Sequence, residues 1–145
     1  MLELYHYDFT EYTDADVDPD GRFGYRYLDA YFTEPDRHPF LIRADGQLAG
    51  FALVRRATSA VGDYDVFDMA EFFVMRKYRR RGVGSEAARF AFDRFPGRWE
   101  VREMAANTPA QAFWRRVIGD YTGGNFTERR LDDSAWLMQS FDFPP

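Results

Sequence analysis

Three consecutive arginines, followed closely by two glycines and a serine, form the part of this chain best suited to binding an anion. The stretch reads Arg79-Arg80-Arg81-Gly82-Val83-Gly84-Ser85. Glycine lacks a Cβ, so a bulky anion can approach the backbone closely, and guanidinium and hydroxyl groups add charge-assisted hydrogen bonds. The residues that follow have a helical pattern, and the first turn of a helix offers unpaired N–H groups at the positive end of its dipole. The stretch predicts a phosphate or pyrophosphate site; a solvated basic turn is the alternative.

A strand and a helix are expected to position this loop. The residues from Met69 to Met75 are almost wholly apolar and aromatic, which is typical of a buried strand. From Gly82 onward, apolar residues recur at helical spacing as far as Phe95, and Pro96 then ends the helix. The chain therefore runs from a strand, through a basic loop, into a helix that begins with glycines.

Two well-known phosphate motifs do not fit the loop. A Walker A loop requires a lysine after its last glycine, and none follows Gly82 or Gly84. The dinucleotide-binding motif has three glycines in the order G-x-G-x-x-G, with alanine tolerated at the third. Ala87 matches that third position only in part, and the arginines are foreign to the motif.

The loop resembles the acyl-CoA loop of the GNAT family of N-acetyltransferases. The family motif Arg/Gln-x-x-Gly-x-Gly/Ala stands here at residues 79–84, after the expected strand and before the expected helix. Residues 72–75 and 82–86 look especially like the diamine (spermidine/spermine) acetyltransferases of that family. A second family feature follows downstream, where a strand ends at Asn107 and a helix begins just after Pro109.

The resemblance implies a fold, a cosubstrate and an acceptor. The fold is α/β, an α+β sandwich whose mixed, mostly antiparallel sheet has about six to seven strands and is flanked by about four helices. Residues 1–145 would form one domain that binds acetyl-CoA and transfers its acetyl group to a small-molecule or peptide amine. The implied cofactor-binding residues are Phe73, Val74, Met75, Arg79, Arg80, Arg81, Gly82, Val83, Gly84, Ser85, Asn107, Phe113 and Trp114.

Two carboxylates on the expected strand are candidates for the catalytic base. An alkylammonium must lose a proton before it attacks a thioester, so a base assists this reaction. The resemblance makes Glu71 the first candidate and Asp68 the second, since different branches of the family have carboxylates at these positions; the catalytic Glu of the diamine enzymes falls on Ala70. Because three residues separate them, Asp68 and Glu71 should point to opposite faces unless a bulge intervenes. Pairing with arginines or helix ends is the alternative role for both.

The chain departs from the family at the position that often supplies a proton to the leaving thiolate. The family frequently has a tyrosine there, whereas this chain has Trp114, which cannot act as an acid. Tyr121, a water molecule or unaided departure remain open. Phe113 and Trp114 either pack against the pantetheine or belong to the core. Asn107 either binds a pantetheine amide or caps the helix that follows.

Composition limits the remaining possibilities. The chain has no cysteine and a net charge of −5, which favours a cytoplasmic protein and disfavours non-specific nucleic-acid binding. It has no apolar run long enough to span a membrane. The two histidines, His6 and His38, are expected to be ordinary residues, so no metal site is predicted. Abundant aromatic residues make a homodimer reasonable.

The other expected elements follow from periodicity and turn residues. Strands are expected at residues 2–9, 39–44, 47–55, 98–106, 126–131 and 136–143, with the last two joined across Asp132 to Ser134. Helices are expected at 25–32 and 109–117. The acidic segment 14–21 lacks the closing glutamate of a calcium loop, because Tyr27 stands there. It is read as a capping turn or as a region that attracts a cationic acceptor.

The sequence is compatible with three functions. The first is an N-acetyltransferase. The second is a non-catalytic acyl-CoA-binding or regulatory module on the same fold. The third, a nucleic-acid-binding protein that uses the basic loop, is disfavoured because the loop is short and the chain is acidic.

Overall fold

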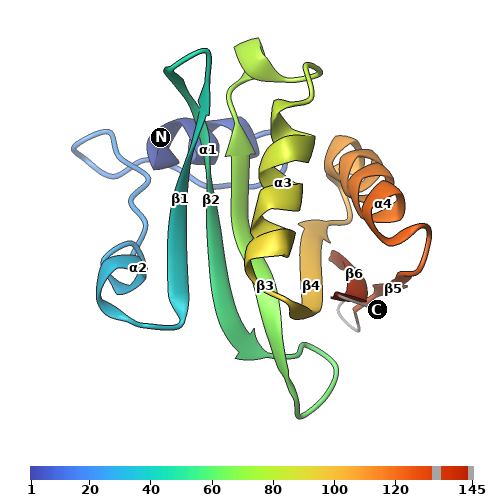
Figure 1. Ribbon diagram of the computed structural model, residues 1–145. Helices are drawn as coiled ribbons and strands as arrows, with labels where there is room; N and C mark the ends of the chain where they lie inside the picture. The colour runs from blue at the N-terminus through green and yellow to red at the C-terminus, as the bar shows by residue number, and fades with distance from the viewer. Residues whose placement is uncertain (132–134, 144–145) are drawn as a thin grey trace.

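The protein is built on one six-stranded sheet that curves behind two helices (Figure 1). The computed structural model describes residues 1–131 and 135–143. The strands are β1 (Arg37–Ala44), β2 (Gln47–Thr58), β3 (Asp65–Val74), β4 (Gly97–Met104), β5 (Thr127–Arg130) and β6 (Trp136–Phe143). Their order is β1-β2-β3-β4-β6-β5, and every pair is antiparallel except β3 with β4. This arrangement confirms the predicted fold class.

Helices cover both faces of the sheet. α3 (Val83–Arg94) and α4 (Thr108–Thr122) lie on one face, and α1 (Leu2–Phe9) lies on the other. The short α2 (Ala30–Thr33) packs beside β1, and a 3-10 helix, η1 (Arg76–Tyr78), follows β3. Within the described residues, no helix has the length and apolar character needed to cross a membrane.

Alternation along the central strands divides the core in two. On β2, Ala52 and Val54 pack toward α3 and α4, where Phe92 and Trp99 are fully buried. The intervening Phe51 and Leu53 pack toward Tyr5 of α1. Each face of the sheet is therefore closed by a different set of helices, and β3 lies between the two cores.

The parallel strands β3 and β4 pair over a very short length and then separate. Their ladder contains only Phe67 opposite Trp99 and Asp68 opposite Glu100. Beyond this point β3 continues to Val74 along β2, and β4 continues to Met104 along β6. Among the described residues, the edge of β3 that faces β4 thus has no strand partner from Met69 onward.

A bulge in β3 lies where the two strands separate. Leu53 of β2 pairs with Glu71, and its neighbour Val54 pairs with Met69, so Ala70 is the extra residue. Such an insertion shifts the alternation of side chains by one position. Asp68 and Glu71 consequently point to the same face of the sheet, toward α1, as the sequence prediction allowed only in the presence of a bulge.

The prediction of a strand at residues 2–9 is wrong. The segment is the helix α1, because Leu2, Tyr5 and Phe9 fall on one helical stripe that packs against the sheet. The expected helix at 25–32 is also shorter, since only Ala30–Thr33 is helical. Conversely, α4 extends to Thr122, five residues beyond its expected end. The turn expected at Asp132 to Ser134 lies outside the described residues.

Candidate active site

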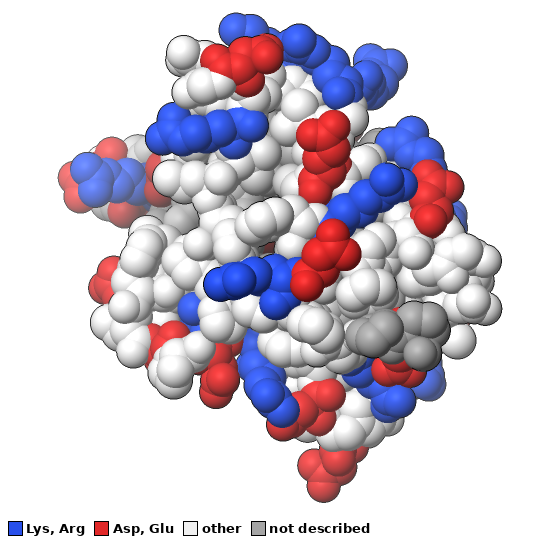
Figure 2. Space-filling model, in the orientation of Figure 1, with Lys and Arg blue, Asp and Glu red and all other residues white. Residues whose placement is uncertain are grey.

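The N-terminus of α3 presents backbone donors to solvent. Gly82, the N-cap, has a φ of 84°, a left-handed conformation that favours glycine, and no side chain caps the helix. The first intrahelical acceptor is the Gly82 carbonyl, which is bound by the Glu86 N–H. The N–H groups of Val83, Gly84 and Ser85 therefore have no intrahelical partner. Arginine and lysine side chains gather over this loop at the top of Figure 2, as an anion site requires.

Gly84 also has a packing role. A Cβ at this position would lie 3.2 Å from the ring of Phe113 and 3.6 Å from Val74. Phe113 in turn stacks on Phe72, with ring centroids 5.8 Å apart. The glycine lets α3 approach α4 and the end of β3 closely, so the structure brings Val74, Gly84 and Phe113 together.

The arginines of the loop differ in how far they are engaged. Arg79 donates from Nε to the Val74 carbonyl, at 2.7 Å, and forms an ion pair with Asp8 of α1. Asp8 also accepts from Arg76, at 2.6 Å. Although burial alone would raise it, the hydrogen bonds from Arg79 and Arg76 hold the pKa of Asp8 below its usual range. These contacts fix the loop to α1.

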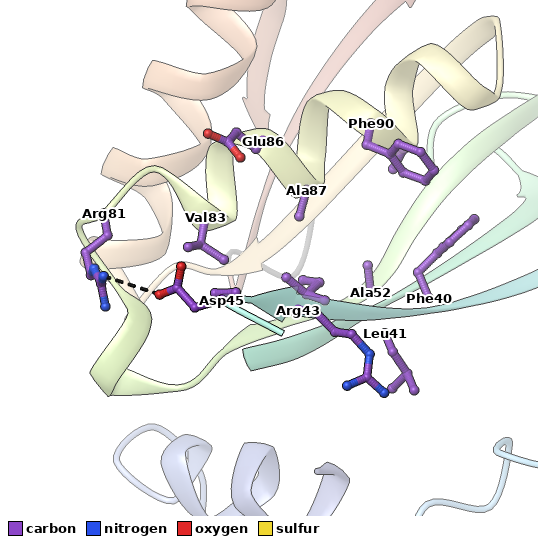
Figure 3. A pocket seen from close by; sticks show the side chains of 13 residues that line it. Phe40, Leu41, Arg43, Asp45, Ala52, Arg81, Val83, Glu86, Ala87 and Phe90 are labelled. Carbon is purple, nitrogen blue, oxygen red and sulfur yellow. Dashed lines mark ion pairs between the residues drawn. The ribbon is translucent and has the colours of Figure 1, made fainter. Parts of the chain in front are cut away.

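The next two arginines remain directed to solvent. Arg80 has a φ of 59° and forms no ion pair among the described residues. Arg81 pairs with Asp45 at 3.7 Å, and both side chains are exposed (Figure 3). Arg80 and Arg81 are therefore the arginines available to an incoming anion.

The remaining predicted cofactor-binding residues lie in different surroundings. The Phe73 side chain packs against Tyr5 on the α1 face, and Met75 borders the same cluster. Trp114 is 5% exposed and belongs to the core under α4. Asn107 caps α4, with its Oδ1 accepting the Ala110 N–H at 3.1 Å.

Glu71 is a half-buried carboxyl held by tyrosines. The Tyr5 hydroxyl donates a hydrogen bond to its Oε2. Burial raises the pKa of Glu71 above its usual range, although hydrogen bonds from Tyr5 and Tyr25 and the nearby His6 act in the opposite direction. No arginine or lysine pairs with Glu71 among the described residues. A carboxyl whose pKa is raised in this way is a better base than an ordinary carboxylate, so it can accept a proton and pass it on.

Asp68 is held quite differently. It is 2% exposed, and its Oδ2 accepts from Arg55 at 2.8 Å and from Arg102 at 2.9 Å. These contacts join β2, β3 and β4 just where β3 and β4 separate. Asp68 is thus suited to holding the strands, and Glu71 has the environment of a base.

Sequence reasoning did not find the tyrosines around Glu71. Tyr5 was assigned to a strand, and Tyr25 lies in an irregular segment before α2. The helical stripe Leu2, Tyr5 and Phe9 was the signal that could have placed Tyr5 on the sheet. No local pattern indicates which strand residue such a side chain reaches.

Two other sequence hypotheses can be placed in the fold. Tyr121 donates to Asp93 at 2.7 Å, and both lie in the last turns of their helices, away from the start of α3.

In the acidic segment, Asp18 accepts from the backbone N–H groups of Asp20 and Arg22, each at 2.9 Å. That is a side-chain-stabilised turn. Among the described residues, no group of three or more His, Asp or Glu side chains is arranged to hold a metal ion.

A pocket of about 700 Å³ lies between β1 and α3. Phe40 and Phe90 face it from the two sides, and Arg81 with Asp45 closes one end (Figure 3). It lies along the side of α3 that faces β1, whereas the separation of β3 from β4 lies on the side that faces α4. The pocket is therefore distinct from the place where Val74, Gly84 and Phe113 meet.

The match to a family model assigns the family. A model of the acetyltransferase (GNAT) family matches residues 1–119. The chain belongs to this family. No sequence among the curated proteins matches it.

Solved acetyltransferases share the fold. Nourseothricin acetyltransferase is 27% identical, covers 77% of this chain and 68% of its own, and superposes with a TM-score of 0.53. NAA60 from Arabidopsis thaliana, in complex with acetyl-CoA, is 15% identical over 99% of this chain and 92% of its own, with a TM-score of 0.65. A putative streptothricin acetyltransferase from Bacillus anthracis, in complex with acetyl coenzyme A, is 16% identical over 79% of this chain and 68% of its own, with a TM-score of 0.57.

Proposed function

We propose that this protein is an N-acetyltransferase that transfers the acetyl group of acetyl-CoA to a primary amine by direct attack in a ternary complex. Two features near β3 together carry the proposal. The N-terminus of α3, which follows β3, has no side-chain cap, and Glu71 on β3 is a half-buried carboxyl without an arginine or lysine partner among the described residues. Acetyl-CoA is the donor, as in the related proteins that were solved with it.

The donor side uses the α3 face of β3. The pyrophosphate binds the N–H groups of Val83, Gly84 and Ser85, with Arg80 and Arg81 adding charge. Pantetheine contains two amide groups, which can form hydrogen bonds with the open edge of β3 as a neighbouring strand would. Phe113, half-buried beside Gly84, supplies an apolar contact for the same arm.

The acceptor approaches from the α1 face and meets the thioester where β3 and β4 separate. Glu71 removes a proton from the acceptor ammonium, and the free amine attacks the thioester carbon. CoA thiolate then leaves, without a tyrosine at the position of Trp114 to protonate it. Asp68 joins β3 to its neighbours β2 and β4 through Arg55 and Arg102 and takes no part in proton transfer.

The second candidate, a non-catalytic acyl-CoA-binding module, is favoured by the burial of Trp114 where related enzymes often have a tyrosine acid. Amine-dependent release of CoA separates the two candidates. Because the chain has no cysteine, a thiol reagent reads released CoA without a protein background.

The test is a panel of amines incubated with acetyl-CoA and the purified protein. Nourseothricin, spermidine, an aminoglycoside and a peptide with a free N-terminus cover small-molecule and peptide acceptors. We expect CoA release with at least one amine, together with a product heavier by one acetyl group. Tight binding of acetyl-CoA with no amine-dependent release would instead support the non-catalytic module.

We further propose that residues 1–145 act as one acyl-CoA domain in the cytoplasm and that the protein forms a homodimer. Size-exclusion chromatography with light scattering tests the homodimer. We expect the mass of two chains, and the mass of one chain at micromolar concentration would contradict the proposal.

A further inference from the structure

We propose that His6 is the residue through which the acceptor's proton leaves the site, accepting it from Glu71 and releasing it to solvent. This inference rests on the proposed acetyl transfer. It concerns a step that the assignment of Glu71 as base leaves open, namely where the proton goes next.

Proton balance requires such a step. The reaction is R–NH3⁺ + CH3CO–S–CoA → CH3CO–NHR + CoA–SH + H⁺. The nitrogen loses two protons; one ends on the thiol, and the other must leave the protein in each turnover. Glu71 is only partly exposed, and its Oε2 is held by Tyr5, which is 7% exposed, so a proton on Glu71 needs a route past this buried tyrosine.

His6 links this buried region to the surface. It lies on α1 one residue after Tyr5, with their ring centroids 5.3 Å apart, and the Phe23 and Tyr25 rings are each 6.0 Å away. The residue is partly exposed, yet its Nε2 is fully buried and has no hydrogen-bond partner. A buried ring nitrogen without a partner is unusual and indicates a site for a water molecule or a proton donor.

The other groups that face Glu71 are unsuited to accept its proton. Burial and the neighbouring carboxylate raise the pKa of both Tyr5 and Tyr25, so neither ionises at neutral pH. Asp68 is occupied by two arginines, Arg55 among them.

The carboxylate nearest to His6 on α1 already has hydrogen-bond partners. Glu3, one helical turn earlier, accepts the backbone N–H groups of Phe23 and Gly24. Among these neighbours, His6 acts electrostatically on Glu71 and has a buried ring nitrogen without a partner, which can accept a proton.

The proposed transfer needs no further reactant. A bridging water carries the proton from the Glu71 carboxyl to Nε2 of His6, and the imidazolium then releases the proton on Nδ1 to solvent. Glu71 returns to the carboxylate form and is ready for the next acceptor. His6 acts through Glu71 and touches no reacting atom, so it is a positioning residue in the proton path rather than a catalytic residue.

The first test is kinetic and uses the best acceptor from the panel. We expect His6→Gln to lower kcat by roughly tenfold to a hundredfold, to leave the KM for acetyl-CoA unchanged, and to flatten the pH profile. Added imidazole should restore turnover in His6→Ala. His38→Gln is the matched control, because His38 lies on β1 stacked on Phe95, and it should behave as wild type.

Two kinetic outcomes overturn the inference while the proposed function stands. One is an active wild type together with a His6→Gln variant of equal kcat and pH profile. The other is a loss of activity that parallels a fall in melting temperature and that imidazole does not rescue. If the wild type acetylates no amine, the proposed function fails and this inference fails with it.

The second test needs no acceptor. The chain has two histidines, so proton NMR gives two ring titrations, which His38→Gln assigns. If a water bridges Glu71 and His6, Glu71→Gln should change the His6 ring resonances and leave those of His38 unchanged. Unchanged His6 resonances would contradict the contact on which the proposal depends.

Discussion

The face of β3 that looks toward α3 and α4 is apolar, and the helix that follows β3 begins with unpaired backbone N–H groups beside exposed loop arginines. The face that looks toward α1 carries polar groups: Asp68, Glu71, Tyr5, Tyr25 and His6. The first face is assembled from residues close together in sequence: β3, the loop and α3 are consecutive. The second combines α1, the segment around Tyr25, and β3, and its hydrogen-bonded pair Tyr5 and Glu71 is 66 positions apart in the sequence. In the proposed function, donor recognition is therefore local, whereas proton transfer depends on tertiary structure.

The bulge at Ala70 connects the two faces. It shifts the alternation so that Glu71 joins Asp68 on the α1 face. The two carboxyls are then neighbours in opposite environments, because Asp68 has two arginines and Glu71 has hydroxyl partners only. The comparison of these faces and these carboxyls yields four predictions.

The largest effect is expected from Glu71→Gln. Glutamine keeps the size of the side chain and can still accept from Tyr5, but it cannot take up a proton. We expect kcat to fall roughly a hundredfold to a thousandfold, with the acetyl-CoA Kd unchanged. Wild-type activity should decline as pH drops through the raised pKa of Glu71, because the protonated carboxyl is no longer a base. Steady-state kinetics and calorimetry measure both quantities, and a variant with wild-type kcat would refute this role.

Asp68→Asn should affect stability. The change leaves Arg55 and Arg102 partly buried without their counter-charge, and we expect a loss of roughly 3 kcal/mol in the free energy of unfolding. The control is Asp65→Asn on the same strand, whose ion pair with Arg56 is exposed and should contribute less than about 1 kcal/mol. Urea denaturation compares the two, and equal losses would contradict the strand-holding role.

Glu103→Gln should change how stability depends on pH. Burial raises the pKa of Glu103 to about 7, opposed by a hydrogen bond from Gln139. Between pH 4.5 and 7 the unfolded chain ionises this group while the folded protein keeps it protonated, so its contribution to stability declines as pH rises through that window. Glu103→Gln should therefore gain roughly 2–3 kcal/mol over wild type from pH 5 to pH 8. A constant difference across this range in denaturation experiments would contradict the assignment.

The smallest effect is expected on the donor side. Arg80→Ala and Arg81→Ala should each weaken acetyl-CoA binding by roughly threefold to tenfold, because each removes one exposed charge near the pyrophosphate. Arg94→Ala is the control, because it also removes one positive charge but lies at the opposite end of α3. The effect should shrink in high salt. If Arg94→Ala weakens binding equally, the arginines act only through the net charge of the protein.

The same comparison explains what the sequence could predict. The loop and α3 were predictable because their glycines, arginines and apolar spacing are consecutive. The Leu2–Phe9 helix was missed because eight residues with loose alternation also fit a strand, and only packing of Leu2, Tyr5 and Phe9 on the sheet decides between them. The shared face of Asp68 and Glu71 follows from a bulge that depends on pairing with β2, and no pattern within β3 indicates it.

The dual use of Gly84 also required the structure. Its sequence context indicates an anion site, and its contact with Phe113 adds a packing requirement. A large side chain at this position would disturb the approach of α3 to α4 as well as any ligand. Acetyl-CoA binding at the N–H groups of Val83 and Ser85 is therefore better measured by observing these amides directly than by replacing Gly84.

The most direct test of the donor site is an acetyl-CoA titration of ¹⁵N-labelled protein followed by NMR. The account predicts the largest amide shifts at Val83, Gly84, Ser85 and Val74, with little change along β1. No saturable shifts, or shifts confined to the pocket between Phe40 and Phe90, would place acetyl-CoA elsewhere or exclude it and would contradict the account.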